Sequence, residues 1–287
     1  LDCLVGSEMC IRDRNGYQIE AEMEKTFYDL GAERLGYPSI VASGDNACIL
    51  HYSTNREKVD NNGLILIDAA AEFKMYSSDV TRTFPVNGKF TKAQKDVYTA
   101  VLNAQELGIK NVTTKKTMSD IHTSTVTSIS QSLVDLGLVP MGVEETISMM
   151  HYFEFFMHGT GHWLGLDVHD AGTTEEKNKP RKLKPGMVTT IEPGIYIRPN
   201  KPEIEFKLLE RDPKKIRERR KSLGMEKATK LESEEMKDAK SIKHKIPKDL
   251  LGIGIRIEDD IVCTENDPIN LTIGAPKTID DVEAICS

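Results

Sequence analysis

Two aspartates at the ends of predicted strands are the first residues of this sequence that suggest chemistry. Asp68 follows the apolar run 64–67, which is short and branched enough to be a buried strand. Asp79 opens the segment 79–85, which alternates, is rich in β-branched residues and ends at a proline. Buried carboxylates are costly unless a positive charge compensates them. Arg82 could supply that charge in a structural ion pair, or the carboxylates could bind a metal ion as hard oxygen ligands.

The segment 155–172 holds an unusual concentration of histidines. His158, His162 and His169 lie within twelve positions, although the whole chain has seven histidines. Glycines stand among them and allow close backbone approach. One such histidine could be a satisfied core residue, but three in a glycine-rich segment favour a functional site. His51, which follows an apolar pair, is by itself more typical of a structural histidine.

Two further predicted strands carry carboxylates. The β-branched run 188–191 leads directly into Glu192, which precedes a Pro-Gly turn. The alternating run 252–262 places Arg256 and Glu258 on one face. The two residues after Glu258 are also acidic, so alternation alone does not distinguish Glu258 from them.

Four carboxylates and one imidazole are a suitable ligand set for two adjacent divalent metal ions. Bridging carboxylates neutralise much of the combined charge, and oxygen-rich coordination favours Mn²⁺, with Co²⁺ or Zn²⁺ as alternatives. Paired metals can share one water, lower its pKa and hold the hydroxide against a carbonyl. The candidate ligands are Asp68, Asp79, His162, Glu192 and Glu258.

The composition of the whole chain excludes several classes of protein. With 287 residues, 39% hydrophobic and 29% charged, the chain has the composition of a soluble globular protein. Its formal net charge of −7 argues against a general nucleic-acid binder. No run approaches the roughly 20 apolar residues of a membrane span. Five scattered cysteines without CxxC spacing favour a reducing, cytoplasmic setting over a disulfide framework.

Predicted helices accompany the strands, which indicates a mixed α and β fold. The residues from Ile19 to Leu35 have an amphipathic helical pattern. Thr91 and Gln94 match a capping box at the start of a second helix. A third helix is predicted from a Ser119 cap to about Leu136, with a buried apolar stripe.

Two segments differ from the rest of the chain. Residues 201–250 contain 16 lysines and arginines against 11 aspartates and glutamates, which makes this segment +5. We interpret residues 201–248 as a charged surface insertion, mainly solvated helix or partly disordered. Its basic run 214–220 could contact RNA or an acidic partner, but a solvated face is the commoner outcome. Residues 1–14 show no clean periodicity and are interpreted as an irregular arm or a foreign stretch.

Four segments resemble the metal-site motifs of the aminopeptidase P (Xaa-Pro aminopeptidase) family. That family belongs to the metallopeptidases with the pita-bread fold, which methionine aminopeptidase and prolidase share. The resemblance runs from about residue 15 to the C-terminus, interrupted by the charged insertion. It implies one α+β catalytic domain over 15–287, a curved antiparallel sheet backed by helices, without the N-terminal domain of the family. The segments are LILIDAAAEFKMYSSDVTRTFPVNGKF, FFMHGTGHWLGLDVHD, TTIEPGIYI and GIGIRIEDDIV.

The resemblance also implies a role for each matching residue. The five candidate ligands would hold two divalent ions, with Asp79 and Glu258 bridging them. Glu192 would also be the general base, and His169 would stabilise the oxygen that becomes negative in the tetrahedral intermediate. His158 would assist catalysis by positioning the substrate around its proline. The residues implied in substrate binding are His51, His158, His169, Tyr196 and Arg256.

The implied reaction is hydrolysis of the bond between an N-terminal residue and a following proline, by a hydroxide that bridges the two ions. The implied partners are peptides with proline in the second position, with no nucleic acid and no membrane, and the parent protein is expected to be a homo-oligomer. Prolidase, which is restricted to dipeptides, is an alternative, although the HWLGLDVHD and RTFPVNGKF segments favour the aminopeptidase. An inactive pita-bread binding protein is a second alternative, and it predicts broken ligands.

Overall fold

The computed structural model describes residues 11–177 and 179–286. They form an α+β fold whose paired strands are antiparallel. The α-helices are α2 (Gly16–Asp29), α3 (Lys92–Lys110), α4 (Met118–Asp135), α5 (Val143–Ser148), α6 (Pro213–Leu223), α7 (Met225–Asp238) and α8 (Ile279–Ile285). The strands are β1 (Arg34–Leu35), β2 (Ile40–Ser43), β3 (Leu64–Ala69), β4 (Ala71–Phe73), β5 (Tyr76–Ser77), β6 (Val80–Pro85), β7 (Glu175–Glu176), β8 (Lys179–Pro180), β9 (Val188–Ile191), β10 (Gly194–Tyr196), β11 (Glu203–Lys207), β12 (Ser241–Lys245), β13 (Gly254–Arg256), β14 (Asp259–Val262) and β15 (Ile269–Asn270).

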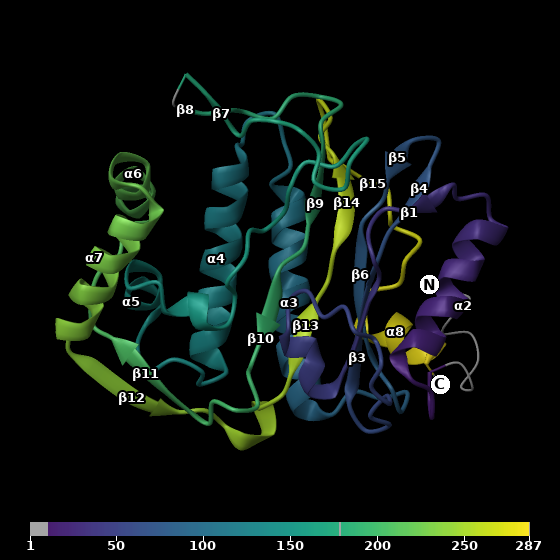
Figure 1. Cartoon of the computed structure of the whole chain (residues 1–287), viewed down its shortest axis with the longest axis horizontal. Coiled ribbons are helices and arrows are strands. Elements are labelled where there is room, and N and C mark those ends of the chain that lie inside the picture. The colour runs from purple at the N-terminus through teal and green to yellow at the C-terminus, as the bar shows by residue number, and fades with distance from the viewer. Residues whose placement is uncertain (1–10, 178, 287) are drawn as a thin grey trace.

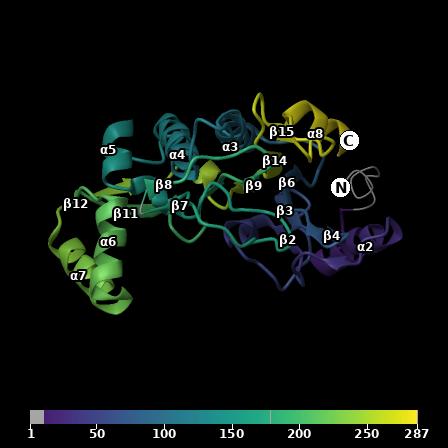
Figure 2. The ribbon, with the colours of Figure 1, turned by 90° about the horizontal axis from the view of Figure 1, so that it is seen from above.

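Helices cover the strands on both sides. Helices α3 and α4 lie on one side of the strands, and α2, α6 and α7 lie on the other (Figure 2). Helices α2 and α8 lie at the end of the molecule opposite α6 and α7 (Figure 1). Among the described residues, no helix is long and apolar enough to cross a membrane.

The sheet β2–β3–β6 holds the two aspartates in the predicted arrangement. Strand β3 is buried along its whole length, as expected for a run of branched apolar residues. It pairs with β6 in a register that places Asp68 opposite Thr81. Asp79 immediately precedes β6, so both aspartates lie at the same end of a buried antiparallel pair.

Two other strand pairs are interrupted at the same level, and each interruption carries a carboxylate. Ile191 of β9 pairs with Asp259 of β14, and the next pairing joins β10 and β13. Glu192 lies between β9 and β10, and Glu258 lies between β13 and β14. Glu192 and Glu258 therefore both lie in the gap between the two strand pairings, opposite one another and near the strands that carry the aspartates.

The helix boundaries follow local capping chemistry. Thr91 caps α3 through the predicted capping box with Gln94. Helix α4 begins at Met118 instead of after Ser119, because Thr117 is the cap and completes a capping box with the carboxylate three residues later. Helix α2 ends well before residue 35, since Gly31 adopts a positive φ of 95° that ends the helical path.

The main core lies where α3 and α4 pack against the strands. Fully burying each large apolar side chain there stabilises the fold by roughly 1.5–3 kcal/mol before the entropy cost of ordering it. Its buried members include Phe84, Val97, Val101, Ile129, Leu133 and Ile195.

The predicted insertion, residues 201–248, contains two strands and two helices. Strands β11 and β12 pair antiparallel, with α6 and α7 in the connection between them, and Ile204 and Phe206 of β11 are buried in the main core. No residue of α6 is buried, which agrees with the predicted solvated helix, and Arg220 pairs with Glu232 of α7 at 2.8 Å.

The first ten residues of the stretch 1–14 lie outside the described part of the chain. Ile11 is buried, and the Arg14 carbonyl accepts a hydrogen bond from the Val59 main chain. The interpretation of this stretch as foreign stays a prediction.

Candidate metal centre

Three of the predicted ligands converge on one point. Asp79 precedes β6, His162 lies in the glycine-rich loop, and Glu258 lies between β13 and β14. One ligand atom from each lies within 4.8 Å of the other two, and His162 Nε2 is 3.3 Å from Asp79 Oδ2. A nitrogen and two carboxylate oxygens that converge in this way are suitable ligands for a transition-metal ion.

Glu192 lies beside this group. Its Oε1 is 3.9 Å from His162 Nε2, and its Oε2 is 3.6 Å from His158 Nδ1. The Glu192 main chain donates to the Thr160 carbonyl, and the Thr190 main chain donates to the His162 carbonyl, so the loop runs along β9. Gly161 is required there, because a Cβ at this position would lie 1.8 Å from the Thr190 carbonyl oxygen.

Asp68 is held at the edge of the group by a buried cation. Arg256 Nη2 donates to Asp68 Oδ2 at 2.6 Å, and Arg256 Nη1 donates to the Tyr196 hydroxyl at 3.0 Å. The Tyr196 hydroxyl is also 2.9 Å from His158 Nε2. Arg256 and Tyr196 thus connect Asp68 to His158 by a continuous chain of hydrogen bonds.

Arg82 is not the ion-pair partner of the two aspartates. Its guanidinium donates to Asp259 at 2.6 Å and to main-chain carbonyls, all on the side of β6 away from Asp68. The alternation of β6 explains this difference, because Arg82 and Thr81 point to opposite faces. The interpretation that Arg82 pairs with Asp68 or Asp79 is therefore wrong, because its ion-pair partner is Asp259.

Tyr37 is a site residue that the sequence reasoning missed. Its hydroxyl contacts both Asp68 Oδ1 and Asp79 Oδ1, which joins the two aspartates. The residue lies between β1 and β2, in a short Gly-Tyr-Pro segment without any periodic pattern. No local signal distinguishes it from an ordinary loop tyrosine, so only the tertiary contact identifies it.

Crowded carboxylates dominate the electrostatics of the group. Burial, followed by the charges of Asp79 and Glu192, raises the pKa of Glu258 well above its usual range. Burial likewise raises the pKa of Glu192 to about 7. The pKa of Asp79 is raised for the same reason, with Asp68 adding to the effect. Acidic groups that are harder to ionise than usual indicate a site with too little positive charge, which a bound cation would supply.

The histidines around the group differ in charge. Burial disfavours the charged form of His162, but its bonds to Asp79 and to the Trp163 carbonyl outweigh burial and raise its pKa to about 9. Burial and the charge of Arg256 lower the pKa of His158 to about 3, so that ring is neutral. A neutral imidazole can donate through one nitrogen and accept through the other.

His169 and His51 occupy the outer edge of the group. The His169 ring packs edge-on against His162, with 4.4 Å between centroids, and its side is exposed. His51 is also exposed, and burial followed by the charge of His162 lowers the pKa of His169. Neither residue belongs to the hydrogen-bonded chain, and their predicted roles in substrate binding stay predictions.

An open cavity of about 370 Å³ adjoins the exposed side of His169. Its lining includes Gly36, Leu166 and Val168. A larger cavity of about 670 Å³ lies at the other end of β3, beside Leu64, and none of its lining residues belongs to the metal group. The lining of the smaller cavity contains His169 but none of the five predicted metal ligands.

Comparison with known sequences identifies the family of this chain. The profile of "Metallopeptidase family M24" matches residues 7–265. The Xaa-Pro aminopeptidase of Escherichia coli (strain K12) is 37% identical over 278 residues, which cover 97% of this chain and 53% of that protein. Human Xaa-Pro aminopeptidase 3 is 34% identical over 257 residues, which cover 90% of this chain and 42% of that protein. The chain spans about half the length of the curated relatives it matches.

Solved structures show the same likeness. The aminopeptidase PepP of Pseudomonas aeruginosa has a TM-score of 0.81 and 38% identity, covering 99% of this chain and 55% of that one. A variant of Escherichia coli aminopeptidase P in complex with substrate has a TM-score of 0.79 and 36% identity, with the same coverage.

Proposed function

This chain belongs to metallopeptidase family M24, and we propose that it forms the catalytic domain of an Xaa-Pro aminopeptidase with the pita-bread fold. The proposed reaction is hydrolysis of the bond between the N-terminal residue of a peptide and a following proline. The observation that carries the proposal is the convergence of Asp79, His162 and Glu258 on one point, with Glu192 beside them. The names of the similar proteins supply the substrate class.

Two divalent ions, with Mn²⁺ as the preferred metal, fit this donor set. The raised pKa values of the carboxylates and the nitrogen of His162 support a site for hard or borderline cations. When bound, such ions polarise a carbonyl and lower the pKa of a bound water. We assign them to the predicted ligands Asp68, Asp79, His162, Glu192 and Glu258.

The side chains around the ions have separate tasks in this proposal. Glu192 takes the proton of the attacking water, because its carboxylate faces the group and its ionic contacts to His158 and His162 are as long as 3.6 and 3.9 Å. The chain of Arg256, Tyr196 and His158 holds Asp68 and fixes the His158 ring against turning. His169, on the side of the cavity, donates to the oxygen that becomes negative.

Two other functions make different predictions. A strict prolidase would use the same group but would cleave dipeptides alone. A binding protein with the same fold would have lost ligands, whereas all five are present in this sequence. The predicted cytoplasmic setting and homo-oligomeric parent protein stay predictions.

The test is hydrolysis of an Xaa-Pro-Xaa tripeptide by the metal-stripped chain, with and without added Mn²⁺. Bound metal is measured on the same sample. The proposal predicts Mn²⁺-dependent release of the N-terminal residue and about two ions per chain. Cleavage of Xaa-Pro dipeptides without cleavage of the tripeptide would favour prolidase, and a folded chain that binds no metal would contradict the proposal.

A further inference from the structure

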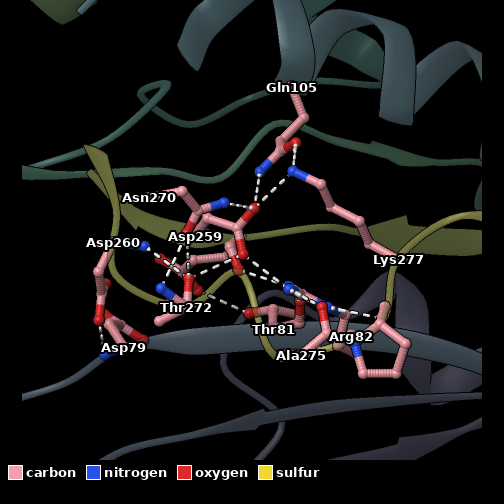
Figure 3. A network of polar contacts seen from close by, with 12 residues as sticks. Asp79, Thr81, Arg82, Gln105, Asp259, Asp260, Asn270, Thr272, Ala275 and Lys277 are labelled. Carbon is pink, nitrogen blue, oxygen red and sulfur yellow. Dashed lines mark hydrogen bonds and ion pairs between the residues drawn. The ribbon is translucent and has the colours of Figure 1, made fainter. Parts of the chain in front are cut away.

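A buried polar network lies directly behind the candidate metal ligands, and its centre is Asp259. The Asp259 side chain is fully buried and accepts hydrogen bonds from five side chains (Figure 3). Arg82 and Lys277 each donate at 2.6 Å, and the other donors are neutral. The five donors come from β6, from α3 and from the C-terminal segment 270–277, and they are Arg82, Gln105, Asn270, Thr272 and Lys277.

One side of this network fixes Glu258. Arg82 Nη1 donates to the Glu258 carbonyl at 2.6 Å and to the Thr81 carbonyl at 2.9 Å. The Thr81 hydroxyl in turn donates to Glu258 Oε2 at 2.7 Å. The network therefore holds both the main chain of Glu258 and, through the Thr81 segment, one oxygen of its carboxylate.

The other side of the network reaches Asp79 through Thr272. The Thr272 hydroxyl donates to Asp259 Oδ1 at 2.8 Å and accepts from the Asp260 main chain at 3.1 Å. Asp260 Oδ2 then accepts from the Asp79 main chain at 3.0 Å. Within the described residues, the other oxygen of Asp260 is buried without a hydrogen-bond partner. The Asp260 main chain also accepts from Leu271 and lies in the β14–β9 pair, whereas the hydrogen bond of its side chain is the one from the Asp79 main chain.

Thr272 is the point where the two sides meet. Its hydroxyl contacts the centre of the network that holds Glu258 and the residue that holds Asp79 (Figure 3). Glu258 and Asp79 lie 14 and 193 positions away from it in the chain, so only the folded C-terminal segment brings this hydroxyl to them.

We propose that Thr272 is a positioning residue for the metal centre, acting through Asp259 and Asp260 on Glu258 and Asp79. This inference rests on the proposed function, because it requires that those two carboxylates bind metal. Partners that orient metal ligands typically change metal affinity by 10- to 100-fold when they are removed, roughly as much as a weak ligand does. The C-terminal segment 270–277 is then part of the metal site, although it offers no ligand.

The test compares three single variants of the full chain by titration of Mn²⁺ into metal-free protein well below the unfolding temperature. Thr272→Val removes the hydroxyl and keeps the shape, and we expect it to weaken Mn²⁺ binding about 10-fold. Thr272→Ser restores the hydroxyl and should bind Mn²⁺ as the wild type does. Thr91→Val, a matched substitution that removes the N-cap of α3, should lower the unfolding temperature and leave Mn²⁺ affinity unchanged.

The outcomes separate this inference from the proposed function. Wild-type protein that binds no Mn²⁺ would contradict the proposed function and, with it, the premise of this inference. Wild-type protein that binds Mn²⁺ with the same affinity as Thr272→Val would overturn the inference alone. Equal losses of affinity in Thr272→Val and Thr91→Val would also overturn it, because they would show a general effect of stability.

Discussion

Two neighbouring residues, Glu258 and Asp259, are both buried carboxylates, yet they lie in opposite environments. Asp259 accepts from two cations and three neutral donors. Burial alone would raise its pKa, but the charges of Arg82 and Lys277 outweigh burial and lower the pKa. In the described part of the chain, Glu258 receives one neutral hydroxyl, and its pKa is raised well above the usual range.

The number of donors around each carboxylate distinguishes a structural carboxylate from one that can serve as a metal ligand. A buried charge whose lone pairs are all satisfied within the protein has nothing left to offer a metal ion. Carboxylates that face one another with few donors repel, and a cation that enters between them attracts both and relieves the repulsion. Alternation along 252–262 could not distinguish the two residues, because both are acidic and both are buried.

The largest expected effect concerns Glu192, a carboxylate of the candidate metal centre with few hydrogen-bond donors around it. Glu192→Gln removes the proposed proton acceptor and should lower kcat by about 10²–10⁴-fold. Bound Mn²⁺ should persist in part, since other ligands remain. Turnover of the tripeptide and metal content are measured on one sample, and unchanged turnover would remove Glu192 from the mechanism.

The next largest effect concerns the satisfied carboxylate. Arg82→Met leaves Asp259 buried with one cation fewer, and we expect it to lower the free energy of unfolding by about 3–5 kcal/mol. Urea denaturation of metal-free protein measures this loss. Adding Asp259→Asn to the variant should recover part of the stability, because the unpaired charge is removed as well. A cost below about 1 kcal/mol would mean that the pair is not structural.

Glu258→Gln should have the opposite sign in the metal-free protein. It removes one of several repelling carboxylates and keeps an oxygen for the Thr81 hydroxyl, so the free energy of unfolding should rise by about 0.5–2 kcal/mol. The same variant should bind Mn²⁺ more weakly than the wild type. A loss of stability in metal-free protein would show that Glu258, like Asp259, is a structural carboxylate.

The smallest effect concerns a satisfied carboxylate remote from the metal centre. Burial would raise the pKa of Glu283, but bonds from Lys95, the Phe90 main chain and Lys89 outweigh burial and lower it. A lowered pKa means that its stabilisation is present above the unfolded value of about 4.5 and is lost as the pH falls below it.

Glu283→Gln tests this sign. The variant should be less stable than the wild type by up to about 1 kcal/mol at pH 7, since the lysine partners are exposed. The difference should shrink as the pH falls from 5 to 3. Thermal unfolding across this range measures it, and a difference that grows on acidification would reverse the assignment.

Much of the fold could be predicted because its signals are local. The buried run before Asp68, the capping box of Thr91 and Gln94, and the helical stripe of α4 each depend on neighbours in the chain. The start of α4 was predicted slightly late, because two hydroxyl residues compete for the cap and only one of them completes a capping box. Residues 201–248 are predicted as mainly solvated helix, and this prediction misses the pairing of β11 with β12, because the two strands are far apart in the sequence and α6 and α7 lie between them.

The sequence by itself determined which residue types the metal centre contains, since acidic and histidine residues at strand ends and in a glycine-rich loop stand out from their surroundings. Only the tertiary structure decided how they are partnered. Arg82 donates to Asp259, and Arg256 donates to Asp68. The Tyr37 hydroxyl contacts both Asp68 and Asp79, which come from segments far from it in the chain. The reason is physical: propensity and periodicity act over a few residues, whereas a buried charge is satisfied by whichever donor the packing brings to it.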